Sequence, residues 1–366
     1  MFKLPSIESV ECLFREMEPL AREGEPFTPS LHTEELLLDD VVAEGEEDEE
    51  VAALNEAKLG PFTPFGGTGV PSALAAIDAG VVDLGLTRTG FALAFKAAAV
   101  MQSADGAHSV AKVGPRVKLI TPENRAELLR YVGEGLMNPT MFVEEQPDGA
   151  LTIKAGAREP NQFKDRIRNY IERMMQLDLA RQLVNGILLV DGALTLRTYN
   201  TPEALLDRLA REAAQRNSDI IGVSKKSRVT VGGVHISALL DDTPPQAGYR
   251  RILAEDAEGS DTLVGARNLG QPFAVRFAPG GFTFRVDVAR RSLLASEEDV
   301  LEALYTNTRM TLGYPNLLRL AHIHSAFTKS EIVSLQVQAA HDYGMAMRAP
   351  EDLSVIFAPF RKGLGG

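Results

Sequence analysis

A short apolar run, Ile187-Leu188-Leu189-Val190, follows an amphipathic helix pattern and leads directly into Asp191-Gly192. A run of this length without polar alternation is typical of a strand that is buried on both faces. Strand and helix patterns alternate along the rest of the chain, which favours a mixed α/β fold. The pattern also places an acid, Asp191, at the end of a buried strand.

The same combination of buried strand and acid occurs earlier in the sequence. Ala73-Leu74-Ala75-Ala76-Ile77-Asp78 predicts a short buried strand that ends in Asp78, with a turn after it. Residues 89–101 are apolar enough to form either a buried strand or a buried helix, and periodicity alone does not separate the two. The sequence therefore predicts two acids at strand ends.

An amphipathic helix is predicted over residues 165–183, because apolar side chains recur at Ile167, Ile171 and Met174. An Asn-Gly pair ends this helix, which carries Glu172 and directly precedes the strand of Asp191. The other elements predicted are a helix over 202–216 with Thr201 as its N-cap, a strand over 219–224, a hairpin over 273–277 and 282–288, and helices over 297–309 and 330–343.

The 366 residues suit one large domain with insertions, or two domains. We expect an acidic, partly helical N-terminal extension over residues 1–60 and a main domain over residues 61–366, with an insertion near residues 229–270. The single cysteine, Cys12, excludes an internal disulfide and a cysteine zinc cluster. Neither a signal peptide nor an apolar run of the roughly 18 residues that a membrane helix needs is present, so we expect a cytoplasmic protein without membrane contact.

The net charge of −12 counts against a nucleic-acid partner, because phosphate binding favours a basic surface. The charge is uneven, however: residues 44–50 alone supply six negative side chains, a run typical of a solvated, flexible segment. Carboxylates that bind metal also add negative charge, which the bound cation offsets. Global charge therefore weakens a nucleic-acid function without excluding it.

Asp78, Glu172 and Asp191 are the candidate metal ligands. A carboxylate at the end of a buried strand needs a partner, because an isolated buried charge is strongly disfavoured. Oxygen ligands suit Mg²⁺ or Mn²⁺, and two such ions about 4 Å apart can activate water and stabilise the leaving oxygen of a phosphodiester. The alternative is structural, since an Asp-Gly pair after a strand is also an ordinary turn signal.

Two other side chains are compatible with a phosphate site. Lys225 follows the predicted strand over 219–224, where its charge could face phosphate or simply be solvated. His322 could ligate a metal, and His324 lies two residues further on. Imidazole also serves as an ordinary hydrogen-bonding group, so a structural role for these histidines stays open.

At these segments the sequence resembles the NurA nuclease family, in scattered motifs over residues 70–360. The motifs are Ala75-Ala76-Ile77-Asp78-Ala79-Gly80, Leu188-Leu189-Val190-Asp191-Gly192-Ala193-Leu194, Ile221-Gly222-Val223-Ser224-Lys225-Lys226-Ser227-Arg228, Phe284-Arg285-Val286-Asp287-Val288, and the segment from Tyr314-Pro315 to Ala321-His322. Their order along one chain carries the resemblance. The sequence departs from the family in placing Ala79 between Asp78 and Gly80, where glycine usually follows the acid directly, so we expect the backbone to turn differently there.

The resemblance implies an RNase H-like mixed sheet flanked by helices. It also implies a deoxyribonuclease, exo- or endonucleolytic or both, that depends on Mn²⁺, with Mg²⁺ as the alternative ion. The implied metal ligands and catalytic residues are Asp78, Glu172, Asp191 and His322, with Asp178 and His324 as alternatives to Glu172 and His322. Lys225, Lys226 and Arg228 are the implied DNA-binding residues. The implied partners are DNA, a HerA-type hexameric ATPase in DNA end processing, and a second copy of the chain.

Two other functions compete with this one. Residues 77–87 resemble the phosphate loop of the actin and sugar-kinase ATPases, which share an RNase H-like core. That function needs a second phosphate loop and a glycine-rich adenosine site, and neither is evident in the sequence. The other alternative is a catalytically inactive NurA-like scaffold, against which the presence of all three acids argues.

Overall fold

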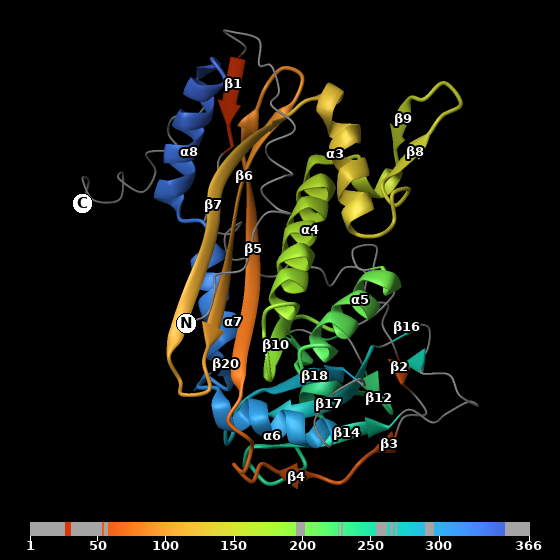
Figure 1. Cartoon of the computed structure of the whole chain (residues 1–366), viewed down its shortest axis with the longest axis vertical. Helices are drawn as coiled ribbons and strands as arrows, with labels where there is room; N and C mark the ends of the chain where they lie inside the picture. Colours follow the sequence, from red (N-terminus) through yellow and green to blue (C-terminus); the bar gives the residue numbers. More distant parts are fainter. Residues whose placement is uncertain are drawn as a thin grey trace, which may run out of the picture.

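The computed structural model describes residues 26–30, 53–54, 58–194, 202–225, 227, 230–253, 262–263, 266–267, 269–289 and 296–347. Three long strands run along most of the molecule, and helices lie against both of their faces (Figure 1). No helix in these ranges is long and apolar enough to cross a membrane.

Five strands form the centre of the sheet, in the order β7-β6-β5-β10-β11. They are β5 (Ala73–Leu86), β6 (Phe91–Gln102), β7 (His108–Ile120), β10 (Gly186–Asp191) and β11 (Asp219–Ser224). Strands β5, β10 and β11 are parallel, and β6 is antiparallel to both of its neighbours. Helices α3 (Pro122–Gly135) and α4 (Pro160–Ala180) connect β7 to β10, and α5 (Glu203–Ala214) connects β10 to β11. This strand order and helix placement is that of the RNase H-like fold, so the predicted fold class is confirmed.

Further strands extend this sheet to twelve within the described residues. Beyond β11 lie β18 (Thr283–Ala289), β17 (Gly270–Arg276), β14 (Gly248–Leu253), β3 (Lys58–Leu59) and β4 (Thr63–Pro64). Beside the far end of β5 lie β1 (Pro26–Pro29) and β21 (Ala346–Met347). The extension over residues 1–60 and the insertion near 229–270 stay predictions, but strands from both segments pair with this sheet.

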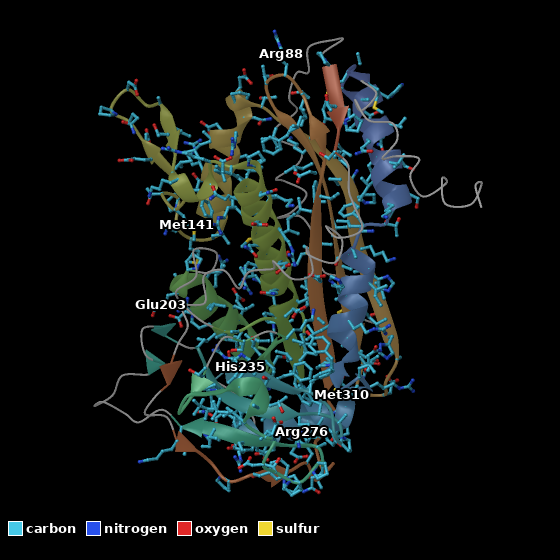
Figure 2. The ribbon with its side chains drawn as sticks, turned by 180° about the vertical axis from the view of Figure 1, so that it is seen from behind. Arg88, Met141, Glu203, His235, Arg276 and Met310 are labelled. Carbon is cyan, nitrogen blue, oxygen red and sulfur yellow. The ribbon has the colours of Figure 1, made fainter. Side chains whose placement is uncertain are left out.

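The shorter elements include four small sheets outside the main sheet. They are β2 (Ala53–Leu54), β8 (Val143–Glu145), β9 (Leu151–Ile153), β12 (Thr230–Val231), β13 (Val234–His235), β15 (Thr262–Leu263), β16 (Ala266–Arg267), β19 (Met310–Thr311), β20 (Tyr314–Pro315) and the 3-10 turns η1 (Ala155–Ala157) and η2 (Ile236–Ala238). Seen from behind, Met310 of β19 and Arg276 of β17 lie toward the same end of the molecule (Figure 2).

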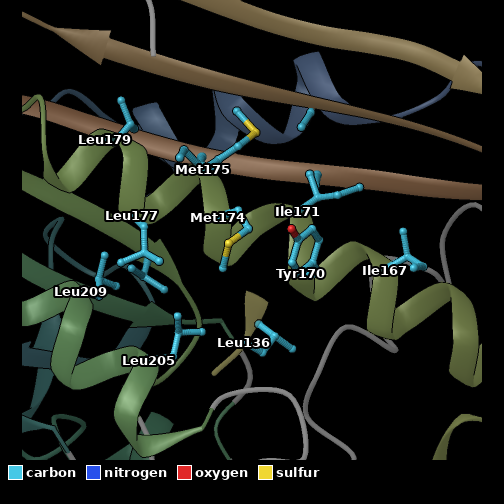
Figure 3. Close-up of a cluster of buried hydrophobic side chains, with 14 of the residues drawn as sticks. Leu136, Ile167, Tyr170, Ile171, Met174, Met175, Leu177, Leu179, Leu205 and Leu209 are labelled. Atoms are coloured by element: carbon cyan, nitrogen blue, oxygen red, sulfur yellow. The ribbon is translucent and has the colours of Figure 1, made fainter. Parts of the chain in front are cut away.

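Separate apolar cores cover the two faces of the central sheet. On one face, α4 contributes Ile167, Tyr170 and Leu177 to a core in which Leu177 lies beside Leu205 and Leu209 of α5 (Figure 3). On the other face lie α6 (Glu297–Asn307) and α7 (Asn316–Ser325), with α8 (Lys329–Asp342) further along the long strands. All of β6 is buried because both of its faces are covered and both of its edges are paired, which explains its nearly continuous apolar sequence.

The structure corrects the prediction that Asp78 ends its strand. Strand β5 continues past Asp78 to Leu86, since β6 pairs with it from Leu74 to Leu86 with one bulge near Asp83. The expected turn after Asp78 is therefore wrong, and Ala79 is simply a buried strand residue. Gly80 is required for a different reason: a Cβ there would collide with the carbonyl oxygen of Ser325 at the end of α7.

Helix predictions also differ from the structure: helix α4, predicted over 165–183, spans Pro160–Ala180. Helix α7 was not predicted, although its buried positions Leu317, Leu318 and Ala321 have helical spacing. Helix α5 begins at Glu203 with Pro202 as its N-cap, one residue later than predicted. The predicted N-cap, Thr201, lies outside the described residues.

Candidate active site

Asp78 and Asp191 occupy matching positions on two neighbouring parallel strands. The last paired residues of β5 and β10 are Ala76 and Leu189, and each acid follows two residues later. Because side chains alternate between the faces of a strand, both carboxylates lie on the face that carries Ala76 and Leu189. That face belongs to the core beneath α6 and α7. The two acids therefore face α7, at the point where β5 and β10 stop pairing.

The Asp78 side chain is buried and is held by helix α7. Its Oδ2 atom lies 2.9 Å from Nδ1 of His322 and accepts a hydrogen bond of 2.6 Å from Oγ of Ser325. Residues three positions apart share one face of a helix, so α7 presents both side chains to β5 together. The other oxygen, Oδ1, lies 3.5 Å from Nη2 of Arg168.

These contacts, together with burial, set the pKa of the Asp78 carboxyl group. Burial, the largest single influence, would raise the pKa of its carboxyl group. The hydrogen bond with His322, the charge of Arg168 and the hydrogen bond from Ser325 act in the opposite direction, and together they lower the pKa to about 2. Asp78 is therefore a buried anion at neutral pH, as a metal ligand must be.

Arg168 joins Asp78 to Glu172. Both Arg168 and Glu172 lie on α4, one helical turn apart, and Nε of Arg168 is 3.2 Å from Oε1 of Glu172. The same Nε donates a hydrogen bond of 2.8 Å to the backbone carbonyl of Ala79. The guanidinium group thus contacts the strand backbone and both acids, which brings the carboxylate of α4 into the neighbourhood of the carboxylate of β5.

Asp191 has a different set of partners. Its Oδ2 atom lies 2.7 Å from Nζ of Lys225, and its Oδ1 accepts a hydrogen bond of 3.0 Å from the hydroxyl group of Tyr314. Lys225 follows β11 directly, and β11 places Val223 beside Asp191. The Lys225 ammonium also lies 5.1 Å from the centre of the Tyr314 ring. Lys225 and Tyr314 therefore converge on Asp191 from β11 and β20.

Some candidates lie elsewhere. His324 does not contact Asp78, and its pKa is lowered by partial burial and by the charges of Lys112 and Lys96. Asp178, the alternative to Glu172, forms an ion pair of 3.3 Å with Arg181 near the end of α4. Lys226 and Arg228 lie outside the described residues. Of the histidines and helix acids considered, His322 contacts Asp78 directly, and Glu172 is linked to it through Arg168.

Three residues of this site had no role in the sequence analysis: Arg168, Ser325 and Tyr314. Arg168 stands four residues before Glu172, and Ser325 stands three residues after His322, so helical spacing could have indicated both. Tyr314 was noted only as part of a motif. Its contact with Asp191 depends on the β19–β20 hairpin, which the sequence pattern did not predict.

The donor set suits a divalent ion such as Mn²⁺, since it combines carboxylate oxygens with one imidazole. Within the described ranges, however, no group of three or more His, Cys, Asp or Glu side chains is arranged so that it could hold a metal ion. The cations Arg168 and Lys225 lie against the carboxylates instead. The residues fit the metal in kind, and binding it requires these ion pairs to rearrange.

Comparison with known proteins shows that part of this site lies within a segment that a family model matches. The family model of the NurA domain matches residues 72–230, which run from the start of β5 to β12 and include Asp78, Glu172, Asp191 and Lys225. No curated protein sequence matches the chain.

Two solved structures illustrate the structural similarity. The NurA nuclease from Sulfolobus solfataricus is 15% identical over 79% of this chain and 89% of that chain, with a TM-score of 0.46. The catalytic domain of human Endonuclease V is 15% identical over 73% of this chain and 84% of that chain, with a TM-score of 0.38.

Proposed function

We propose that this chain is a metal-dependent nuclease that hydrolyses phosphodiester bonds in DNA, because residues 72–230 match the family model of the NurA domain, which the sequence motifs also resemble. The observation that carries the proposal is the placement of Asp78 and Asp191 at matching positions of β5 and β10, on one face of the sheet. Glu172 on α4 is linked to Asp78 through Arg168. All three acids lie within the matched domain.

Asp78, Glu172, Asp191 and His322 would hold Mn²⁺, with Mg²⁺ as the alternative. A bound divalent ion supplies activation of water and stabilisation of the leaving oxygen. The low pKa of Asp78 keeps its carboxylate charged for this purpose. With Asp78 ionised, Nδ1 of His322 carries the proton that they share, so Nε2 is the ring nitrogen suited to ligate metal or transfer a proton.

Lys225, Lys226 and Arg228 are proposed to hold DNA phosphates. Lys225 stands at the end of β11, and its side chain is 35% exposed, so it can reach a backbone phosphate beside Asp191. The net charge of −12 makes tight binding of free DNA by the whole surface unfavourable. The negative net charge therefore supports an arrangement in which a partner protein binds the DNA and delivers it to this chain.

We further propose a cytoplasmic homodimer that works with a HerA-type hexameric ATPase in DNA end processing. Light scattering of the purified chain, alone and with such an ATPase, tests this proposal. Dimers and a larger complex are the expected species. Monomers that form no complex would contradict the assembly without bearing on the chemistry.

Cleavage itself is tested with single- and double-stranded DNA, incubated with Mn²⁺, with Mg²⁺ or with EDTA. End-labelled and circular substrates separate exo- from endonucleolytic cleavage. We expect metal-dependent cleavage that falls by roughly 10²–10³-fold or more in Asp78→Asn and Asp191→Asn, because each loses one charge at the reacting centre. Asp178→Asn, on the same helix as Glu172 but paired with Arg181, is the matched control. A wild-type chain that binds the ATPase but never cleaves DNA would instead support the inactive-scaffold alternative.

The ATPase alternative loses its structural basis in this fold. Residues 77–86, which resemble a phosphate loop in sequence, form part of strand β5 and pair with β6. The connection from β5 to β6 comes only after Leu86. The resemblance to actin and sugar-kinase ATPases is therefore limited to the core topology.

A further inference from the structure

The position of Arg168 suggests a role beyond that of an ordinary ion pair. Its guanidinium group contacts two acids from different elements, Asp78 of β5 and Glu172 of α4. The hydrogen bond from its Nε atom to the carbonyl of Ala79 fixes it against the strand backbone. A single cation thus lies beside two of the three carboxylates that are proposed to hold metal.

The oxygens that face Arg168 are the ones best placed to take a metal ion. Oδ2 of Asp78 already accepts a hydrogen bond from Ser325 and lies beside Nδ1 of His322. Oδ1 is therefore the oxygen better able to bind a further cation, and it is the oxygen beside Arg168. On Glu172, Oε1 is likewise the atom nearest to Arg168.

A guanidinium ion and a divalent metal compete for these oxygens. The side chains of Arg168, Asp78 and Glu172 are only 17%, 5% and 14% exposed, so water screens their charges weakly. A second cation between the same carboxylates would be repelled by Arg168 unless the guanidinium moved away. Without any cation, in turn, the two carboxylates would be buried with uncompensated charge.

We propose that Arg168 is a built-in counter-ion of Asp78 and Glu172 that competes with the metal for their oxygens and lowers the affinity of the site for the metal. This proposal rests on the proposed function, because it requires Asp78 and Glu172 to be metal ligands. The ion pairs of Arg168 with Asp78 and Glu172 must be broken when the metal binds to these acids. A variant that lacks these ion pairs should therefore bind the metal more tightly. Arg168 acts through the two acids and is a positioning residue.

The test measures Mn²⁺ binding to the full chain without DNA, by the electron paramagnetic resonance signal of free Mn²⁺ or by calorimetry. Arg168→Gln removes the charge, and Arg168→Lys keeps it. An opposite charge beside a carboxylate changes its proton affinity by roughly tenfold or more, so we expect about tenfold tighter Mn²⁺ binding in Arg168→Gln. Arg168→Lys should stay near the wild-type affinity.

Lys164 provides the matched control. It lies on the same helix, one turn before Arg168, and its ion pair of 3.5 Å is with Asp83, which is not a proposed ligand. Lys164→Gln should leave the affinity for Mn²⁺ unchanged. Thermal unfolding gives a second measurement: Arg168→Gln should unfold at a lower temperature without metal and gain more from added Mn²⁺ than the wild type does.

The outcomes separate this proposal from the function on which it rests. Unchanged or weaker Mn²⁺ binding in Arg168→Gln, with saturable binding in the wild type, overturns the role of Arg168 and leaves the metal-dependent nuclease standing. If no variant binds Mn²⁺, both fail. If Arg168→Gln does not fold without metal, Arg168→Met takes its place, because methionine keeps the apolar stem of the side chain. The Mn²⁺ affinity of Arg168→Met is then compared with that of the wild type.

Discussion

The imidazole of His322 on α7 lies 2.9 Å from the carboxylate of Asp78 on β5, and this contact joins positions 244 residues apart in the sequence. Ser325 donates to the same oxygen from the next turn of the helix. Helix α7 therefore does more than cover the sheet, because its His322 and Ser325 hold the Asp78 carboxylate and lower its pKa together with Arg168 of α4.

The first prediction concerns stability at acid pH. The folded-state pKa of Asp78 is lowered from 3.8 to about 2, so its ionisation stabilises the fold above about pH 4. This contribution, of about 2 kcal/mol, is lost as the pH falls from about 4 to about 2. Urea unfolding between pH 5 and pH 3 should therefore show a steeper loss of stability in the wild type than in Asp78→Asn. Equal pH dependence in the two proteins would show that the Asp78 contacts do not matter energetically.

His322→Ala should slow the cleavage of DNA that is already bound. The imidazole beside Asp78 is suited to ligate metal or transfer a proton, a role worth roughly 10²–10⁴-fold in rate. Single-turnover cleavage at saturating protein isolates this step from binding. His324→Ala, on the same helix but away from Asp78, is the control. The opposite pattern, in which only His324→Ala is slow, would place the functional histidine two residues later.

Lys225→Ala should weaken DNA binding rather than the chemical step. Because Lys225 also pairs with Asp191, binding is best compared between Asp191→Asn and Asp191→Asn/Lys225→Ala, in which that ion pair is already absent. Loss of one phosphate contact should reduce the slope of log affinity against log salt by about 0.9. Lys154→Ala, whose ammonium bonds to the Thr140 carbonyl, is the control. An unchanged slope would show that Lys225 pairs with Asp191 and does not contact a DNA phosphate.

Gly80→Ala should loosen the contact between β5 and α7. Its Cβ would collide with the Ser325 carbonyl, and backbone atoms on both sides limit the relief that is available. We expect a loss of about 1–3 kcal/mol in the free energy of unfolding, together with slower cleavage because Asp78 and His322 separate. Gly66→Ala is the control, since its Cβ would make only ordinary contacts, the nearest at 3.5 Å. If Gly80→Ala is as stable and active as Gly66→Ala, α7 can shift without consequence.

The sequence predicted the helices and strands whose formation depends on local patterns of apolar residues. The apolar run before Asp191 predicted β10, and the spacing of Ile167 and Ile171 predicted the helix that carries Glu172. The position of Asp78 within its strand was not predictable in this way. Strand β5 continues because β6 pairs along its whole length, a non-local condition that a six-residue pattern cannot express.

The partners of the acids were less predictable than the acids themselves. Arg168 reaches Asp78 because β10 stops pairing with β5 after Ala76, which leaves room beside the strand for a side chain of α4. Tyr314 reaches Asp191 through a two-residue turn in which Leu312 and Gly313 both have positive φ. Leucine is an unusual residue for such a turn, so the ordinary turn signal is absent.

The distance in sequence between Asp78 and His322 has a consequence for the order in which the protein is made. Synthesis completes β5, α4 and β10, and with them all three acids, long before the ribosome reaches α7. Because a domain generally folds as a unit, the acids have been synthesised but are not yet packed against their helix at that stage. Until α7 docks, Asp78 lacks the histidine and the serine that lower its pKa. On the proposed function, a growing chain would therefore lack His322 at its site, and DNA cleavage would begin only when α7 packs against β5.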